Sequence, residues 1–138
     1  MVSKELIRQK MELYIRLLNA GDVEGIIGLY ADDAVVEDPV GTDPYVGIDA
    51  IASFYRGGLG QVEVSAEQTG AVRTTAASEG AVPFRVILRN DDQTIVVEPI
   101  DFMRFNDDGK IVCMRAFWSP EHNYNSVIHE DTLEETVQ

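Results

Sequence analysis

Three alternating runs of apolar residues occupy the second half of the chain and constrain its fold most strongly. They cover residues 82–89, 94–105 and 111–119, and clusters of Asn, Asp, Gly and Gln at 90–93 and 106–109 separate them. Alternation with a period of two predicts strands, and short polar turns between such runs predict hairpins. We therefore expect a meander of three antiparallel strands.

Three helices precede the meander. Residues 4–20 repeat apolar side chains at helical spacing, and Ser3 is a suitable N-cap. Asp22 can cap a shorter helix that extends to about Tyr30, and residues 49–56 form the third helix. Helices followed by a meander indicate an α+β fold, in which the three helices pack on the concave face of a curved, mainly antiparallel sheet.

The remaining segments predict shorter strands. Residues 34–38 form a strand that ends before Pro39, and residues 45–46 form a very short one. Two modest strands cover 61–66 and 71–77. Together with the meander, these segments fit into a single sheet.

The length of 138 residues suits one domain with one core. We expect this domain to comprise residues 1–124. Residues 125–138 are acidic and poor in large apolar side chains, which indicates a frayed helix or disorder. The sequence therefore predicts that this tail is dispensable for activity.

Composition argues against two classes of partner. The net charge of −13 argues against nucleic acid and against anionic lipid, whereas a small apolar ligand remains compatible with it. The chain contains no apolar run that could span a bilayer and no signal-peptide core. A single cysteine, Cys113, makes the reducing cytoplasm the default location. His122 and His129 lack the spacing of metal ligands, so we expect no metal.

Three polar side chains lie on otherwise apolar faces. Asp101 is the only polar residue of its row in the run 94–105. Asp38 follows Val36 at the end of an apolar strand row, and Tyr14 carries the only polar atom on the inner face of the first helix. Each has a structural alternative: Asp38 can cap a turn, and the other two can be hydrogen-bond partners within the core.

The two carboxyl groups have different surroundings. Asp38 lies beside a chain turn, where water can keep it ionised, while the apolar row around Asp101 favours the neutral acid. An ionised carboxylate can remove a proton from a carbon next to a carbonyl group. Tyr14 and a neutral Asp101 can both donate hydrogen bonds to the oxygen that becomes an enolate. The set predicts general-base catalysis with an oxyanion hole.

The segments around these residues resemble one known family. Tyr14 lies in Tyr-Ile-Arg-Leu-Leu-Asn-Ala-Gly-Asp, Asp38 in Val-Val-Glu-Asp-Pro-Val-Gly, and Asp101 in Pro-Ile-Asp-Phe-Met-Arg-Phe. With Met-Arg-Ala-Phe-Trp at 114–118, they make the chain resemble the ketosteroid isomerases, or steroid Δ-isomerases, over residues 5–120. The resemblance implies the cone-shaped α+β barrel of nuclear transport factor 2.

The resemblance also implies a reaction and a set of roles. A 3-oxo-Δ5 steroid would be converted, without a cofactor, to the conjugated 3-oxo-Δ4 steroid through a dienolate. Asp38 would move the proton from C4 to C6, while Tyr14 and a neutral Asp101 would hydrogen-bond the C3 oxygen, as is known in that family. Tyr30 and Tyr55 would extend the hydrogen-bond network. The steroid pocket would be lined by Phe54, Phe84, Met114 and Trp118.

An outer apolar surface predicts a homodimer. Helices cover only one face of the sheet, which leaves Ile87, Phe102 and Phe117 on the other face as an association surface. Two other functions stay open. One is a non-isomerase of the same fold, such as a cyclase or an epoxide hydrolase, and the other is a protein that binds an apolar molecule without chemistry.

Overall fold

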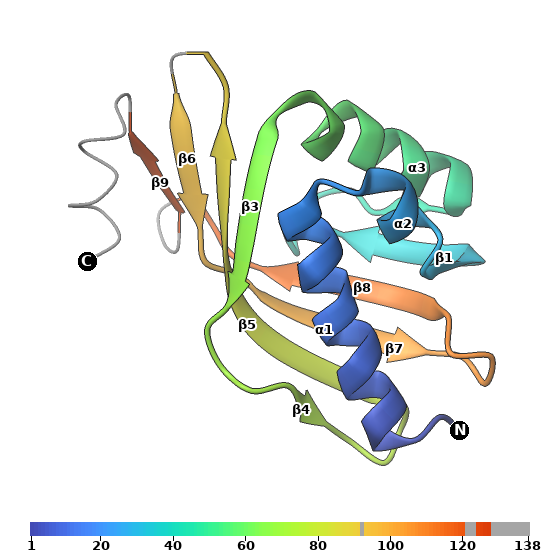
Figure 1. Ribbon diagram of the computed structural model, residues 1–138. Coiled ribbons are helices and arrows are strands. Elements are labelled where there is room, and N and C mark those ends of the chain that lie inside the picture. Colours follow the sequence, from blue (N-terminus) through green and yellow to red (C-terminus); the bar gives the residue numbers. More distant parts are fainter. Residues whose placement is uncertain (92, 121–123, 128–138) are drawn as a thin grey trace.

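The computed structural model describes residues 1–91, 93–120 and 124–127, with side chains up to residue 120 (Figure 1). The described residues form three α-helices, a short 3-10 helix and nine strands. The helices are α1 (Lys4–Ala20), α2 (Val23–Ile27), α3 (Ile48–Gly57) and η1 (Leu59–Gln61). The strands are β1 (Tyr30–Glu37), β2 (Tyr45–Val46), β3 (Glu63–Gln68), β4 (Arg73–Thr74), β5 (Glu79–Arg89), β6 (Thr94–Val97), β7 (Ile100–Phe105), β8 (Ile111–Phe117) and β9 (Tyr124–Val127).

The strands form one curled, mixed sheet. Its main path has the order β2-β1-β8-β7-β5-β6-β9, and β3 and β4 also pair with β5. Strand β1 runs parallel to β8, whereas the other paired strands are antiparallel. Figure 1 shows α1 lying across the hollow side of the sheet, with α2 and α3 beside β1. The expected α+β architecture, with three helices against a curved sheet, is confirmed.

Helix α1 is capped at both ends and packs closely on β5. The hydroxyl oxygen of Ser3 accepts the backbone N–H of Leu6 at 3.0 Å, and Gly21 ends the helix with a φ of 67°. Such caps typically stabilise a helix by about 1 kcal/mol at the N-terminus. A Cβ atom at Gly80 of β5 would lie 2.5 Å from Sδ of Met11. The glycine therefore permits the close approach that brings the inner face of α1 to the sheet.

The expected strand over residues 94–105 is in fact two strands. Glu98 and Pro99 separate β6 from β7, and the two strands pair with different halves of the long strand β5. Proline cannot donate a hydrogen bond to a sheet ladder, so the pairing breaks there. Val96 and Val97 are both buried, which shows that the simple alternation also ends at this point. The long strand β5 thus joins both strands and continues past the break between them.

The second helix is shorter than its sequence predicts. It ends at Ile27, and Tyr30 begins β1 instead of ending the helix. The backbone N–H of Gly28 bonds to Glu24 O and closes the last turn. Tyr30 then pairs with Ile111 of β8, so sheet formation competes successfully with the helical pattern.

The segment beyond Pro120 also differs from the expectation of a frayed helix or disorder. Residues Tyr124–Val127 form β9, which pairs antiparallel with β6. Since β9 spans the expected boundary between residues 124 and 125, it joins the start of the tail to the sheet. The division into 1–124 and 125–138 stays a prediction.

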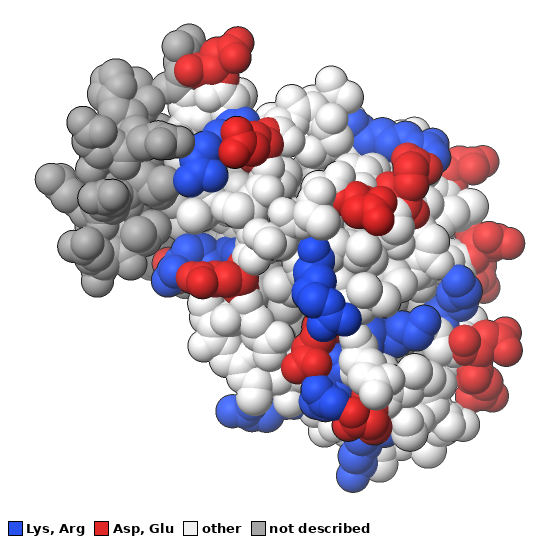
Figure 2. Space-filling view, viewed as in Figure 1, with Lys and Arg blue, Asp and Glu red and all other residues white. Residues whose placement is uncertain are grey.

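Charges are interspersed on the face seen in Figure 2. Arg8 on α1 pairs with Glu5 and Glu12, and Arg56 pairs with Glu24 at 2.7 Å. Exposed pairs of this kind contribute little to stability, roughly 0–1 kcal/mol each. They leave no continuous basic stripe on this face of the described residues.

Candidate active site

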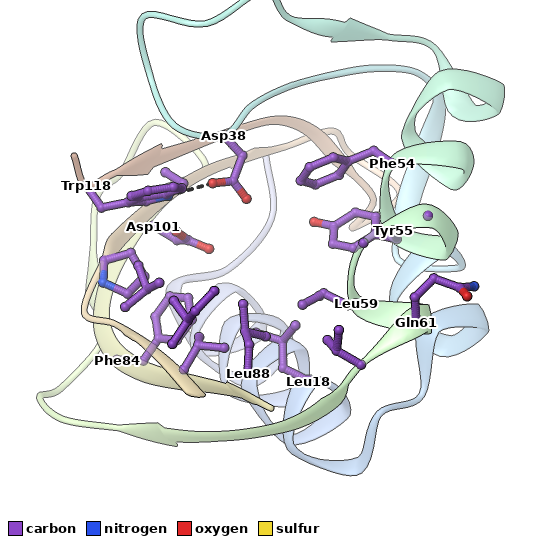
Figure 3. Close-up of a pocket in the computed structure, with 18 of the residues that line it drawn as sticks. Leu18, Asp38, Phe54, Tyr55, Leu59, Gln61, Phe84, Leu88, Asp101 and Trp118 are labelled. Carbon is purple, nitrogen blue, oxygen red and sulfur yellow. Dashed lines mark hydrogen bonds between the residues drawn. The ribbon is translucent and has the colours of Figure 1, made fainter. Parts of the chain in front are cut away.

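A cavity of about 430 Å³ lies between α1, α3 and the curled sheet. This volume is within the range of pockets that hold drug-sized ligands, about 300–1,000 Å³. Its wall is mostly apolar, with two carboxyl groups and two tyrosines among the lining residues. The lining comprises Tyr14, Leu18, Asp38, Phe54, Tyr55, Gly57, Gly58, Leu59, Gln61, Val62, Phe84, Val86, Leu88, Arg89, Asn90, Ile95, Val97, Pro99, Asp101, Ala116 and Trp118. Figure 3 shows the carboxyl groups of Asp38 and Asp101 pointing into this cavity.

Asp38 lies in the bend that follows β1. The bend is held to β8 by a hydrogen bond from the backbone N–H of Val40 to Ala116 O at 2.9 Å. Trp118 donates its indole N–H to Oδ1 of Asp38 at 2.7 Å (Figure 3). Burial raises the pKa of Asp38, and the hydrogen bond from Trp118 opposes that rise because it stabilises the carboxylate. The carboxyl group of Asp38 thus has one fixed hydrogen-bond donor and faces the cavity.

Asp101 is the second residue of β7 and lies between Val82 of β5 and Ala116 of β8. Its side chain is 2% exposed, and within the described part of the chain its Oδ1 has no hydrogen-bond partner. Burial, and then the charge of Asp38, raise the pKa of Asp101 well above its ordinary value. A carboxyl group in this position is stable as the neutral acid and can donate a hydrogen bond into the cavity.

Three tyrosine hydroxyls form a buried chain behind the cavity. The Tyr55 hydroxyl lies 2.9 Å from that of Tyr14 and 2.6 Å from that of Tyr30. Burial raises the pKa of all three well above the ordinary value, so each keeps its single proton. If Tyr14 directs its proton into the cavity, Tyr55 must donate to Tyr14, and Tyr30 to Tyr55. The chain therefore supports Tyr14 as a donor to a ligand.

The apolar walls contain three of the four side chains expected there. Phe54 stacks on Tyr45 of β2 with the ring centroids 4.4 Å apart, and Phe84 and Trp118 lie across the cavity from it. Figure 3 shows these side chains around the carboxyl groups. Met114 is an exception: it has no exposed surface and does not belong to the lining. It belongs to the hydrophobic core, where it pairs with the buried residues Val36 of β1 and Met103 of β7.

Sequence reasoning did not assign several lining residues. Leu59 and Gln61 come from η1, which the sequence indicates only as a glycine-rich helix exit. Leu88 and Ile95 come from opposite strands of the β5–β6 hairpin. Their alternation predicts an inward face, but only the curvature of β5 decides that this face lines a cavity instead of filling a core.

The sequence profile of the SnoaL-like domain matches residues 11–114, which is most of the chain. The chain belongs to the SnoaL-like family. The match includes all the elements from the middle of α1 to β8, and thus the three residues Tyr14, Asp38 and Asp101. It agrees with the NTF2-like fold that the sequence resemblance implies.

Individual SnoaL-like relatives have different chemistries. A curated steroid Δ-isomerase from Nocardioides simplex is 45% identical over 114 residues, covering 83% of this chain and 90% of that protein. The epoxide hydrolase LasB from Streptomyces lasalocidi is 33% identical over 126 residues; the match covers 83% of this chain and 42% of that protein. A solved structure of SalBIII, described as an epoxide hydrolase/cyclase-like enzyme in pyran ring formation, superimposes with a TM-score of 0.82 at 25% identity. That superposition covers 91% of this chain and 98% of SalBIII. The first relative supports an isomerase, while the names of the other two describe epoxide hydrolase or cyclase-like enzymes.

Two further observations concern the described residues of this SnoaL-like chain. They contain no cluster of His, Cys, Asp and Glu that could hold a metal ion. None of their helices is long and apolar enough to cross a membrane. His122 and His129 lie outside the described residues.

Proposed function

We propose that this protein is a cofactor-independent steroid Δ-isomerase that converts 3-oxo-Δ5 steroids into 3-oxo-Δ4 steroids. The observation that carries the proposal is the contrast between two acids in one apolar cavity. The hydrogen bond from Trp118 opposes the pKa rise that burial causes at Asp38, whereas burial and the charge of Asp38 raise the pKa of Asp101 well above its ordinary value. The 45% identity to a steroid Δ-isomerase supports the same reaction.

The proposed reaction is a pair of proton transfers by one base. Asp38 removes a proton from C4, and the electron pair of that C–H bond moves toward the C3 oxygen to give a dienolate. Tyr14 and neutral Asp101 donate hydrogen bonds to this oxygen as its negative charge develops. Asp38 then returns the same proton to C6, which places the double bond at C4–C5 and restores the carboxylate. Tyr30 and Tyr55 keep Tyr14 oriented as a donor.

The test is the growth of the ultraviolet absorbance of a conjugated enone when purified protein is mixed with a Δ5-3-oxo steroid. Asp38→Asn should abolish nearly all turnover and leave steroid binding intact, because an amide cannot act as the base. Asp101→Asn keeps a donor and should be mild. Asp101→Leu should lower kcat by about 10²–10³-fold, the usual loss for one oxyanion donor. If Asp101→Asn is as inactive as Asp38→Asn, the assignment of roles is wrong.

Opening of an epoxide is the second candidate, because two relatives are connected with epoxide hydrolase chemistry. A neutral Asp101 could protonate the epoxide oxygen while Asp38 deprotonates the attacking hydroxyl group or water. Such an enzyme would consume an epoxide and produce no enone from a Δ5-3-oxo steroid. The absorbance assay therefore separates the two candidates.

A homodimer is the proposed assembly. Ile100 and Phe117 face each other across the β7–β8 pair, and they are 48% and 44% exposed. Phe102 lies half-buried on the same outer face. Exposed apolar side chains that adjoin on one face favour association. Light scattering should give the mass of a dimer at micromolar protein, and a monomer mass would contradict the proposal.

A further inference from the structure

The cavity is buried at one end and open at the other. Tyr14 and Asp101, 3% and 2% exposed, lie at the buried end. Gly57 and Gln61 on one side, and Asn90 of the β5–β6 turn on the other, are exposed lining residues. A long ligand whose oxygen meets the buried donors must therefore place its opposite end at this mouth.

A glycine leaves one part of the mouth without a side chain. Gly57 is the last residue of α3, and a Cβ atom built there would meet no atom within 4 Å. Its backbone does not have a positive φ, so a larger residue can be introduced without strain. At the neighbouring Gly58, by contrast, a Cβ atom would lie 3.2 Å from Phe54 O. The gap at Gly57 is thus open space that one substitution can fill.

Apolar side chains from two parts of the chain line the same cavity as Gly57. Leu59 of η1 follows Gly57 along the chain, and Leu88 and Ile95 belong to the β5–β6 hairpin. Figure 3 shows Leu59 and Leu88 below the carboxyl groups and facing the cavity. An alkyl chain that leaves the cavity here would be in contact with apolar surface before it reaches water.

We infer that the substrates include steroids with an alkyl side chain at C17, and that this chain leaves the cavity through the gap at Gly57. This inference rests on the proposed function, because the donors that hold the C3 oxygen at the buried end direct ring D toward the mouth. Gly57 is then a specificity-determining residue that contacts the side chain and takes no part in proton transfer.

The experiment compares two substrates in three proteins. The substrates are androst-5-ene-3,17-dione, which has no side chain, and 3-oxochol-5-enoic acid, which has a carboxylate-ended side chain at C17. The proteins are the wild type, Gly57→Phe, and Ser53→Phe as a matched control. Ser53 is exposed one turn earlier on α3 and is not a lining residue, so the same ring is added to the same helix outside the cavity lining.

The wild type should convert both substrates with kcat/KM values within about tenfold of each other, since a side chain that reaches open space costs little. Gly57→Phe should lower kcat/KM for the acid by about tenfold or more, mainly because KM rises. The same variant should change kcat/KM for the dione by less than about threefold. Ser53→Phe should change neither. A wild type that discriminates against the acid by about 100-fold, or a Gly57→Phe variant that affects both substrates equally, would overturn the inference.

A binding measurement separates this inference from the proposed function. Trp118 is the only tryptophan of the chain and lines the cavity, so its fluorescence reports occupancy without turnover. If neither steroid is isomerised, the proposed isomerase function fails. The inference about the mouth still stands if Gly57→Phe selectively weakens binding of the acid, and it fails if both ligands bind as they do to the wild type.

Discussion

Replacement of Trp118 by Phe should raise the pKa of Asp38 and move the acidic limb of the pH–rate profile upward. The indole N–H lies 2.7 Å from Oδ1 of Asp38, so the variant keeps an aromatic ring and removes one donor to a carboxylate. A hydrogen bond to a charged group contributes about 1.5–3 kcal/mol, and one pKa unit corresponds to about 1.36 kcal/mol. Because Asp38 is only partly buried, we take the lower end of this energy range, which corresponds to a rise of about one unit in the pKa of Asp38.

The assay is kcat/KM against pH, whose acidic limb reports the base of the free enzyme. The limb should move to higher pH by about one unit in Trp118→Phe, since a less stabilised carboxylate binds its proton more tightly. Phe84→Leu is the control, because Phe84 lines the same cavity and is not a hydrogen-bond partner of Asp38. It should lower kcat/KM at every pH and leave the limb in place. An unmoved limb in Trp118→Phe, or a limb moved to lower pH, would refute the reasoning.

Two other predictions concern stability. Burial raises the pKa of Asp101, so the folded protein keeps a proton that the unfolded chain releases above a pKa of about 3.9. The free energy of unfolding of the wild type should therefore fall as the pH rises from that value through the pKa of the folded state. Urea unfolding of Asp101→Asn should show a smaller loss over this window, and an equal loss in both proteins would argue against a protonated Asp101. A chain ending at Val127 should keep the Tm and activity of the full protein. A chain ending at Pro120 lacks β9 and should have a lower Tm and a lower steroid affinity. Equal Tm values for the two truncated chains would show that β9 does not contribute to stability.

The parts of the fold that follow from local periodicity could be predicted from the sequence. Helix α1 and its caps are local features, since Ser3 and Gly21 act within one turn of the helix they limit. The inward orientation of Asp101 also follows from a period of two along β7. The end of α2 depends on the pairing of Tyr30 with the distant strand β8, and a one-dimensional pattern does not contain that information. The break between β6 and β7 has a local signal in Pro99, which the alternation on both sides of it outweighed.

The same division applies to the candidate site. Tyr14 and Asp101 can be found because a lone polar atom on an apolar face is anomalous within its own element. The central position of Tyr55 in the hydroxyl chain cannot be found in this way, because it brings together three residues from α1, α3 and β1. The hydrogen bond from Trp118 to Asp38 likewise joins residues 80 positions apart. The catalytic roles assigned to these residues stay predictions until the variants are measured.

The distribution of hydrogen bonds explains how two identical side chains could act as acid and base. Both carboxyl groups face one cavity, and the charge of Asp38 raises the pKa of Asp101 further above the value that burial gives it. A second negative charge is therefore disfavoured once one carboxylate is present. Trp118 donates to Asp38, whereas Oδ1 of Asp101 has no partner among the described residues, so the charge is more stable on Asp38. On this argument a single indole N–H, supplied by the residue that follows β8, favours the charge on Asp38, and removing it should bring the proton affinities of the two aspartates closer together.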